Sequence, residues 1–354
     1  MIGAPSPPLR IVQAMCTDGF GGIERYVVTL ANGLARDGCE VSVLGGDRVR
    51  MTKELSPSVA SWHPAGGMPR VIARLAAMGR LDVVHAHMTH AELAAALARP
   101  LTGARLVVTR HFPARRGATR AGRVAAAVIR RSVDLQLASS ADVAARVDGP
   151  SQIVPPGVPA FAAGAPAARE RAVLVLQRLE PEKDTATALR AWACSELGDH
   201  GWELRIAGDG RERAALEALA ADLSIAGSTR FLGAVDDVEH VLARASILLA
   251  TGPDEAFGLS VVEAMAAGVP VVATGRAGHL ENVGLCPDAV LYTPGDAREA
   301  GRRLRELAED EPRRAEYGRK LQALQRGHFS AERQTSVTLA FYRALVSAPR
   351  KRMM

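Results

Sequence analysis

The chain has 354 residues, of which 48% are hydrophobic and 23% are charged, and its formal net charge at pH 7 is +6. This length suits about two domains with full cores, and no apolar run approaches the length of a membrane span, so the sequence indicates a globular protein rather than a transmembrane one. The opening residues lack the long apolar segment of a signal peptide. We therefore expect a cytoplasmic protein that is at most peripheral to the inner face of the membrane.

The cysteines and the charges exclude further classes of protein. The four cysteines are scattered without a C-x-x-C pair, which argues against a zinc site and a disulfide framework and fits a reducing compartment. The positive net charge invites a nucleic-acid-binding interpretation. Acidic residues alternate with the basic ones along most predicted helices, however, so a solvated surface is the favoured interpretation of the charge.

The chain opens with a strand, a glycine-rich loop and a helix. A strand from Arg10 to Met15 precedes the loop that contains Gly21 and Gly22, and a helix from Glu24 to Asp37 follows. With the next strand, at Glu40 to Leu44, these elements form a βαβ unit with glycines at its first turn. Glycines in such a turn also serve simply to let the helix and the strand pack closely.

Histidines stand at the ends of the next two predicted strands. One strand begins at Asp82 and ends with His85 and His87, and a strand from Arg105 to Thr109 leads directly to His111. The carboxyl ends of parallel strands face the crevice in which open α/β sheets bind ligands. His111 is thus a candidate site residue, with backbone capping as its alternative role, whereas we expect His85 and His87 to support the crevice wall.

The segment from Arg110 to Arg131 contains seven arginines and no acidic residue. Its second half, Gly122 to Ser132, has the apolar spacing of an amphipathic helix. Two interpretations remain open: contact with an anionic membrane surface or an acidic acceptor, and a packed helix with a solvated basic face. No aromatic residues are interleaved for base stacking, so we do not interpret the segment as a nucleic-acid site.

A second series of strands and helices begins after a stretch rich in Ala, Gly and Pro that indicates a linker. The first strand of this series, from Ala172, is followed by Arg178 and Lys183. The plainest role for these two cations is an exposed ion pair with Glu180 or Glu182. The further predicted elements are helices at 185–194, 212–223, 238–244, 296–309, 311–326 and 331–346, and strands at 202–207, 229–232, 246–250 and near Val290.

The most informative stretch runs from Ala250 to Gly278. Its pattern predicts a strand end, a loop with Glu255, a helix from Leu259 to Ala267 that places Glu263 about one turn inside, and a buried strand that ends at Thr274. A helix that starts after a glycine at the end of a strand offers free N–H groups and the positive end of its dipole, which suits a phosphate.

The run from Glu255 to Thr274 reads E-x-F-G-L-x-x-x-E-A-M-A-x-G-x-P-V-V-A-T. It resembles the signature of the retaining glycosyltransferases of family four, which have the GT-B fold. The resemblance implies an α/β protein of two Rossmann-like domains whose parallel sheets face an interdomain cleft, with a C-terminal helix that crosses back to the first domain. The implied divisions are an acceptor domain at 1–160, a linker at 161–171, a donor domain at 172–328, and the crossing helix with a basic tail at 329–354. We expect the basic tail itself to be disordered.

The same resemblance assigns roles to individual residues. Glu255 would address the transferred sugar and His111 the donor sugar or its acceptor, both as catalytic residues. Glu263 would bind the ribose, and Ala234 and Val235 the base. The residues assigned to the donor diphosphate are Arg178, Lys183, Gly21, Gly22, Gly258, Leu259 and Ser260. Three positions depart from the family pattern: Pro156 replaces a common asparagine, and Gln177 and Asp184 replace glycines, so the loop between Gln177 and Asp184 is expected to differ in shape.

The predicted function is the transfer of a sugar from a nucleoside diphosphate donor, with UDP the first choice, to a hydroxyl or amine acceptor with retention of configuration. No two aspartates are separated by one residue, so the D-x-D metal motif is missing, and we expect neither a metal nor a cofactor. The acceptor is expected to be a small molecule or lipid-linked. Three alternatives remain: a nucleotide-sugar epimerase, an inactive nucleotide-binding scaffold and a basic nucleic-acid-binding protein.

Overall fold

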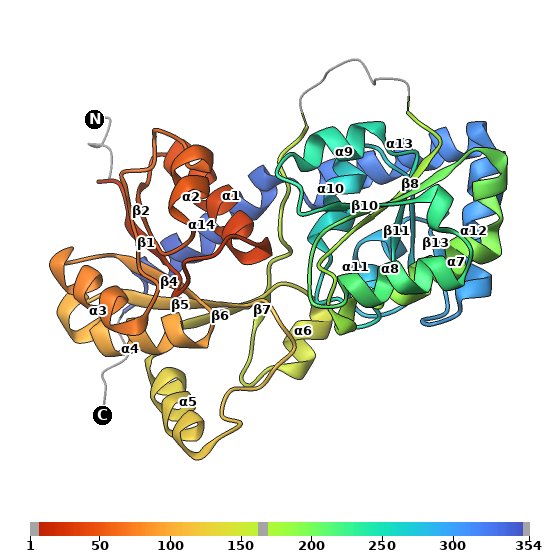
Figure 1. Ribbon diagram of the computed structural model, residues 1–354. Coiled ribbons are helices and arrows are strands. Elements are labelled where there is room, and N and C mark those ends of the chain that lie inside the picture. Colours follow the sequence, from red (N-terminus) through yellow and green to blue (C-terminus); the bar gives the residue numbers. More distant parts are fainter. Residues whose placement is uncertain (1–6, 162–168, 350–354) are drawn as a thin grey trace, which may run out of the picture. The chain divides into compact units, whose positions relative to one another are not determined.

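The computed structural model describes residues 7–161 and 169–349, which form two compact units (Figure 1). The first unit comprises the chain up to Gly157 together with Ala331 onward, and the second runs from Val158 to Ser330. The middle of the expected linker and the basic tail lie outside the described residues. Among the residues that are described, no helix has the length and hydropathy needed to cross a membrane.

The first unit is built on a seven-stranded sheet in which all neighbouring strands are parallel, in the order β3-β2-β1-β4-β5-β6-β7. Its central strand β4 and the neighbouring β5 are fully buried, because helices cover both faces of the sheet. The strands are β1 (Arg10–Ala14), β2 (Glu40–Leu44), β3 (Ser61–His63), β4 (Val83–His87), β5 (Arg105–Arg110), β6 (Leu135–Ala138) and β7 (Gln152–Ile153).

Two helices from opposite ends of the chain cover one face of this sheet. The last helix, α14, lies alongside the first, α1 (Figure 1). Its residues Leu339 and Tyr342 are buried in the same apolar cluster as Tyr26 and Leu30 of α1, which is why the C-terminal segment belongs to the first unit. The helices of this unit are α1 (Gly22–Arg36), α2 (Arg48–Glu54), α3 (Met68–Ala77), α4 (Thr89–Thr102), α5 (Arg120–Ser132), α6 (Ala141–Arg146) and α14 (Ala331–Ser347).

The second unit is built on a six-stranded, all-parallel sheet in the order β10-β9-β8-β11-β12-β13. Valine, leucine and isoleucine fill its central strands β8 and β11, and both strands are buried because helices flank them. The strands are β8 (Ala172–Leu176), β9 (Glu203–Ala207), β10 (Thr229–Gly233), β11 (Ile247–Ala250), β12 (Val271–Thr274) and β13 (Val290–Tyr292).

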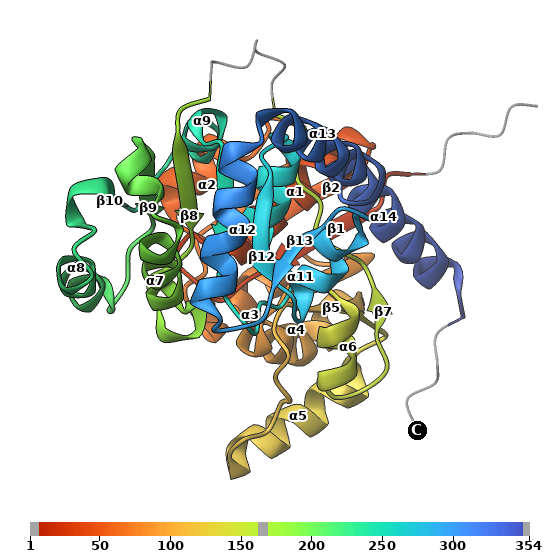
Figure 2. The same cartoon turned by 90° about the vertical axis from the view of Figure 1, so that its right-hand side faces the viewer.

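Helices connect these strands, and Figure 2 shows α12 next to α7 against the sheet. The longer helices are α7 (Thr185–Ser195), α8 (Arg213–Asp222), α9 (Val238–Arg244), α10 (Leu259–Ala266), α12 (Ala297–Glu309) and α13 (Glu311–His328). The shorter helical turns are η1 (Pro181–Lys183), η2 (Leu197–His200), η3 (Ala226–Ser228), α11 (Gly278–Glu281) and η4 (Val283–Leu285).

Three features differ from the sequence-based expectations. The first helix begins at Gly22, two residues before the expected Glu24, because Glu24 accepts a hydrogen bond from the N–H of Gly21 and so caps the helix start at Gly21. The resemblance implied a closing strand of the first domain around Ile153, but the pairing of β7 extends only over Gln152–Ile153 and stops shortly before two prolines, which lack the N–H that a sheet requires. At the end of the expected linker, Arg169 donates to backbone carbonyls of the second unit, including that of Ala245 at 2.8 Å.

Candidate active site

Several predicted site residues of each unit lie where the strand order of its sheet reverses. In the first unit the reversal lies between β1 and β4, and in the second between β8 and β11. At such a point the loops that leave neighbouring strands turn in opposite directions and open a crevice beyond the carboxyl ends. The glycine loop and His87 lie at the first reversal. Lys183 and Glu255 lie at the second.

The glycine loop of the first unit is exposed. Gly21 and Gly22 both lie at the protein surface, immediately after the loop that leaves β1. The N–H of Gly21 donates to the Glu24 carboxylate at 2.8 Å, so this group is already satisfied. A ligand that approaches the start of α1 therefore meets Gly22 as the first backbone N–H outside that capping bond.

His111 is hydrogen-bonded to a second histidine. Its Nε2 lies 3.0 Å from Nδ1 of His87, and Nε2 of His87 lies 2.9 Å from Oε1 of Gln13. Tyr26 packs edge-on against the His111 ring, with ring centroids 4.8 Å apart. Burial, and then the positive charge of Arg110, lowers the pKa of His111 to about 3, so the ring is neutral at physiological pH.

In the second unit, the loop after β8 replaces the family's glycines with side-chain hydrogen bonds. The amide of Gln177 donates to the carbonyl of Lys183 at 3.0 Å and to the hydroxyl of Thr251 at 3.1 Å, and so joins the loop after β8 to the end of β11. Asp184 adopts the left-handed φ of 49° that a glycine would take, and its carboxylate accepts from the Thr187 hydroxyl at 2.7 Å at the start of α7. The two departures from the family pattern thus form one ordered loop.

Lys183 and Glu255 form an ion pair across the strand reversal. The ammonium of Lys183 donates to the Glu255 carboxylate, and their side chains are only 18% and 20% exposed. The sequence had suggested Glu180 or Glu182 as the partner of Lys183, and for Lys183 that alternative is wrong, because the loop turns its side chain toward β11. Arg178 does pair with Glu182, at 2.7 Å, in a contact that is 63% and 54% exposed.

The helix that follows Glu255 begins as the sequence predicts. Gly258 has a φ of 90°, a conformation that favours glycine, and it accepts the N–H groups of Val261 and Val262 through its carbonyl. The first-turn N–H groups of Leu259 and Ser260 have no acceptor among the described residues. Glu263 lies one turn further along α10 and is half-buried. The positive end of the helix is therefore open to an anion.

Two residues that the sequence analysis did not single out, Gly278 and Asn282, hold the Glu255 loop, and a third, His279, lies beside them. The N–H of Gly278 donates to the carbonyl of Glu255 at 2.9 Å, and the Asn282 amide donates to the carbonyl of Phe257. His279 lies 2.8 Å from the Thr274 hydroxyl, and burial lowers its pKa to about 4. The sequence signal that could have identified these residues is their position shortly after a strand, because α11 starts four residues beyond the end of β12.

The residues assigned to the base lie further from the strand reversal. Ala234 and Val235 follow β10, the edge strand, which is separated from β8 by β9. Ala234 is exposed, whereas Val235 is half-buried against the apolar core of the unit. Both are attached to the same carboxyl edge of the sheet as Arg178.

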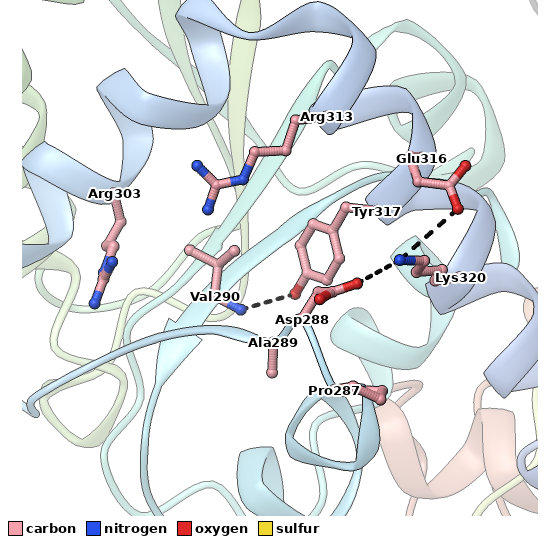
Figure 3. Close-up of a pocket in the computed structure, with 9 residues that line it drawn as sticks. All are labelled: Pro287, Asp288, Ala289, Val290, Arg303, Arg313, Glu316, Tyr317 and Lys320. Atoms are coloured by element: carbon pink, nitrogen blue, oxygen red, sulfur yellow. Dashed lines mark hydrogen bonds and ion pairs between the residues drawn. The ribbon is translucent and has the colours of Figure 1, made fainter.

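A cavity of about 410 Å³ opens beside β13, the edge strand on the other side of this sheet from β10 (Figure 3). It lies beside Val290, the first residue of β13, and under α12 and α13. Its Lys320 is paired with Asp288 at 2.5 Å and with Glu316 at 3.8 Å. None of the predicted site residues lines it, and it is at the amino end of the strands, so it is separate from the candidate active site.

The arginine-rich segment divides into a buried part and an exposed part. Arg110 and Arg116 both bind Asp148, each at 2.9 Å, and Arg116 also binds the buried Glu92, so these two arginines do not belong to a basic surface as the sequence suggested. Burial alone would raise the pKa of Asp148, but hydrogen bonds from Arg116 and Arg110 hold it well below its usual range. The exposed arginines are Arg115, Arg120, Arg123, Arg130 and Arg131.

Comparisons with known proteins identify the class to which this arrangement belongs. Residues 160–323 match the model of the glycosyl transferases group 1, and residues 20–160 match that of glycosyltransferase family 4. A phosphatidyl-myo-inositol mannosyltransferase of Mycolicibacterium smegmatis is 31% identical over 296 residues, which cover 72% of this chain and 72% of that protein.

Other relatives match over shorter stretches. A 2-deoxystreptamine glucosyltransferase of Streptomyces kanamyceticus is 34% identical over 38% of this chain and 35% of its own length. An exopolysaccharide phosphotransferase of Streptomyces coelicolor is 35% identical over 42% of this chain, which spans only 16% of that protein.

Solved structures show the same fold at low sequence identity. HepE of Anabaena, in complex with UDP and glucose, superimposes with a TM-score of 0.78 at 19% identity, over 95% of this chain and 100% of the other. Sucrose-phosphate synthase of Thermosynechococcus elongatus has a TM-score of 0.78 at 18% identity, over 96% and 100%. The two parallel sheets and these neighbours show the GT-B fold.

Proposed function

The chain belongs to the glycosyltransferases of group 1 and family 4, and we propose that it transfers a hexosyl group from a nucleoside diphosphate donor to a hydroxyl or amine of an acceptor, with retention of configuration. The observation that carries the proposal is the Lys183–Glu255 pair beside the open start of α10. It supplies a cation and N–H donors for a diphosphate. It also supplies a carboxylate that accepts from sugar hydroxyls.

The donor half of the proposal rests on charge. Cleavage of the bond between the sugar and the diphosphate leaves negative charge on the phosphate oxygens, and a fixed cation and a helix start stabilise that charge. Lys183, Arg178 and the N–H groups of Leu259 and Ser260 take this role, while Glu263 accepts hydroxyl protons of the ribose. These groups take the place of a metal ion. Transfer is accordingly expected to continue in the presence of a chelator.

Uridine is the proposed base, read by the loop of Ala234 and Val235. HepE, whose fold this chain shares, is described in complex with UDP and glucose. Relatives from Mycobacterium tuberculosis are named as GDP-mannose-dependent, and guanosine is therefore the first competitor to test.

Retention is proposed to proceed by departure of the diphosphate and attack of the acceptor on the same face of the sugar. Glu255 orients the sugar through its hydroxyls, and no covalent intermediate with the enzyme is required. NMR of the product decides this part of the proposal. A product of inverted anomeric configuration would refute it.

The acceptor is proposed to be a small polyhydroxylated or amino compound, free or attached to a lipid. Relatives are named for 2-deoxystreptamine and for phosphatidyl-myo-inositol, and both names describe cyclic polar acceptors, the second on a lipid. The exposed arginines of α5, next to the 67% exposed Val124, would contact an anionic membrane that carries such a lipid.

Vesicle sedimentation tests the membrane contact. The variant Arg120→Gln, Arg123→Gln should lose binding to vesicles that contain anionic lipid at low salt. The matched variant Arg302→Gln, Arg319→Gln, which removes two exposed arginines from α12 and α13, should keep it. If the wild-type protein does not sediment at low salt, the acceptor is taken from solution.

Thermal stabilisation by nucleoside diphosphates tests the donor site without knowledge of the acceptor. A ligand that binds only the folded protein raises its stability by mass action, by about 2.7 kcal/mol at a hundred times its dissociation constant. UDP should stabilise the wild type, whereas the variant Arg178→Ala, Lys183→Ala should lose the effect.

The control variant Arg319→Ala, Lys320→Ala removes the same two charges from α13 and should retain the effect. No stabilisation of the wild type by any nucleoside diphosphate would contradict the proposed donor site. Turnover of the sugar nucleotide without an acceptor, to another sugar nucleotide, would instead identify an epimerase. Binding without any turnover, unaltered by a change at Glu255, would identify an inactive scaffold.

A further inference from the structure

A continuous line of hydrogen bonds runs from His111 through the interior of the first unit. Beyond His87 and Gln13, the amide Nε2 of Gln13 lies 3.2 Å from the hydroxyl of Tyr342 on α14. This hydroxyl lies 2.5 Å from Nδ1 of His85. The line ends at the Thr109 hydroxyl, 2.7 Å from Nε2 of His85. In order, its members are His111, His87, Gln13, Tyr342, His85 and Thr109, and we call them the imidazole chain.

All members of the imidazole chain except His111 are buried to 1% exposure or less. Burial lowers the pKa of His85 to about 3 and that of His87 well below 6.5. Each histidine therefore carries a single ring proton at neutral pH, and each ring has one donor and one acceptor nitrogen. A chain built of such groups has a direction.

The amide of Gln13 sets the direction. Its Oε1 accepts only, so the proton of His87 is on Nε2. Nδ1 of His87 is then the acceptor, and Nε2 of His111 must donate to it. On the other side, Nε2 of Gln13 donates to the Tyr342 hydroxyl. The buried O–H of Tyr342 needs an acceptor, and Nδ1 of His85 is the one beside it, so we assign the His85 proton to Nε2, which then donates to Thr109. Every bond in the chain has one proton.

We propose that the imidazole chain fixes His111 as the Nε2–H tautomer, so that its Nδ1 is a permanent hydrogen-bond acceptor toward a hydroxyl of the sugar or the acceptor. His87, Gln13 and Tyr342 are then positioning residues for the proposed transfer, and the inference rests on the proposed function for the identity of that hydroxyl. Nδ1 of His111 has no partner within residues 7–161 and 169–349.

The surroundings of the chain keep it neutral. The rings of Tyr26, His87 and His111 pack together, with centroids 5.6 Å apart for the first pair and 5.3 Å for the last two. The positive charge of Arg110 disfavours a second proton on the His111 ring. Arg110 is itself bound to Asp148 at 2.9 Å. A buried donor or acceptor left without its partner costs free energy, and this cost is what holds each ring in one orientation.

Nitrogen NMR of the folded, full-length protein reads the tautomer directly. In protein labelled with ¹⁵N-histidine at pH 7, the two ring nitrogens of His111 should give the distinct signals of a protonated Nε2 and an unprotonated Nδ1. The signals are assigned by their loss in the variant His111→Asn. A protonated Nδ1 in the wild type would overturn the proposal, because it would mean that the Gln13 amide and every proton upstream of it point the other way.

Two replacements of His87 separate positioning from packing. In His87→Gln the new amide can accept from His111 through its oxygen and donate to Gln13 through its nitrogen, so the His111 tautomer should be retained. His87→Leu offers neither bond, and the His111 signals should move to the averaged values of an exchanging ring. Equal His111 spectra in His87→Leu and in the wild type would overturn the proposal.

Activity gives a second reading where transfer is measurable. His87→Leu should lower kcat by about tenfold or more with a smaller change in KM for the donor, because the acceptor atom of His111 is then only partly present, and His87→Gln should recover most of it. If no transfer is found with any donor, the proposed function fails, but the NMR result still decides the tautomer.

The distant end of the chain supplies the final test. Tyr342→Phe removes the hydroxyl that links Gln13 to His85, so the Gln13 amide loses one of its two restraints and the His111 spectrum should broaden or shift. Tyr317→Phe, which removes a buried hydroxyl from the second unit, serves as the control for lost stability. If the His111 signals shifted in Tyr317→Phe and not in Tyr342→Phe, that result would contradict an imidazole chain that includes Tyr342 of α14.

Discussion

The two units share a topology, but their sites differ in chemistry. Each places its site residues at the carboxyl ends of parallel strands where the strand order reverses. In the first unit the groups at that edge are the neutral rings of His87 and His111 and the amide of Gln13. In the second they are the ions Lys183 and Glu255.

Burial explains why each unit uses the groups that it does. The imidazole chain is almost completely removed from water, and neutral donors and acceptors survive there because each is satisfied. Lys183 and Glu255 keep about a fifth of their surface exposed, which limits the cost of desolvating two charges. Under the proposed function, the ions of the second unit would meet the charged diphosphate, and the neutral groups of the first unit would meet a sugar hydroxyl.

The largest expected effect comes from removing the negative member of the ion pair. Glu255→Gln should reduce sugar transfer by about a hundredfold or more, because the proposed function assigns the orientation of the sugar to this carboxylate. UDP affinity should stay equal or rise, since Lys183 no longer has an internal competitor for phosphate. Steady-state kinetics and calorimetric titration measure the two quantities. Glu182→Gln, which alters an exposed carboxylate nearby, is the matched control, and equal effects of the two variants would contradict the role of Glu255.

Acid should destabilise the first unit more steeply than the second. His85 and His111 have pKa values near 3, and that of His87 is well below the ordinary 6.5, whereas the second unit has one comparable histidine, His279, near 4. Because these folded-state pKa values are depressed, the unfolded chain takes up protons first. The stability that the neutral rings contribute is complete above pH 6.5 and is lost as the pH falls toward the folded values.

Each buried histidine should cost about 1.4 kcal/mol of unfolding free energy per pH unit below pH 6. Native-state hydrogen exchange between pH 7 and pH 5 measures this separately for peptides of β4 and of β11, after correction for the intrinsic exchange rate. A similar slope for both peptides would mean that the histidine content of the units does not set their acid sensitivity.

A methyl group added at Gly278 should displace the backbone that carries Glu255. A Cβ there would lie 2.5 Å from Cα of Phe257 and 2.7 Å from the carbonyl oxygen of Glu255. Gly278→Ala should therefore lower the unfolding free energy by about 1–3 kcal/mol and weaken transfer by moving Glu255. Gly227→Ala has no heavy atom within 4 Å of the added methyl and should be nearly neutral. Urea unfolding of both variants measures the difference, and equal midpoints would contradict the close approach.

The smallest effect is expected at the exposed pair. Arg178 and Glu182 are more than half exposed, and Glu182→Ala should change the unfolding free energy by less than about 1 kcal/mol. UDP affinity should rise slightly, because Arg178 is then free to bind phosphate. Weaker binding would show that Glu182 orients Arg178 rather than competing for it. Thermal stabilisation by UDP at several concentrations measures the change.

The sequence predicted the strands and helices that carry the site because their signals are local. The run from Glu255 to Thr274 contains its own turn glycine, helix stop and β-branched strand, and α10 and β12 lie where the pattern placed them. The loop from Gln177 to Asp184 was harder. A glutamine in place of a glycine gives no sign that its amide will reach Thr251, which lies 74 positions away.

Contacts between distant segments set the limit of the sequence-based analysis. The pairing of Lys183 with Glu255 depends on how β8 and β11 align. From the sequence alone, the neighbouring Glu180 and Glu182 were equally good partners for Lys183. His85 and His87 were noticed at a strand end. Their hydrogen bonds could not be predicted, because Tyr342 comes from a helix 257 positions further along the chain.

The position of α14 also affects the order in which the protein is completed during synthesis. The second unit is one continuous segment, from Val158 to Ser330, so all its parts are present before α14 has been translated. The first unit starts earlier but waits for Ala331–Ser347 to cover α1 and to deliver Tyr342 to Gln13. Although domains generally fold in the order of synthesis, the second unit of this chain should be completed first, and the first unit should acquire its native stability last.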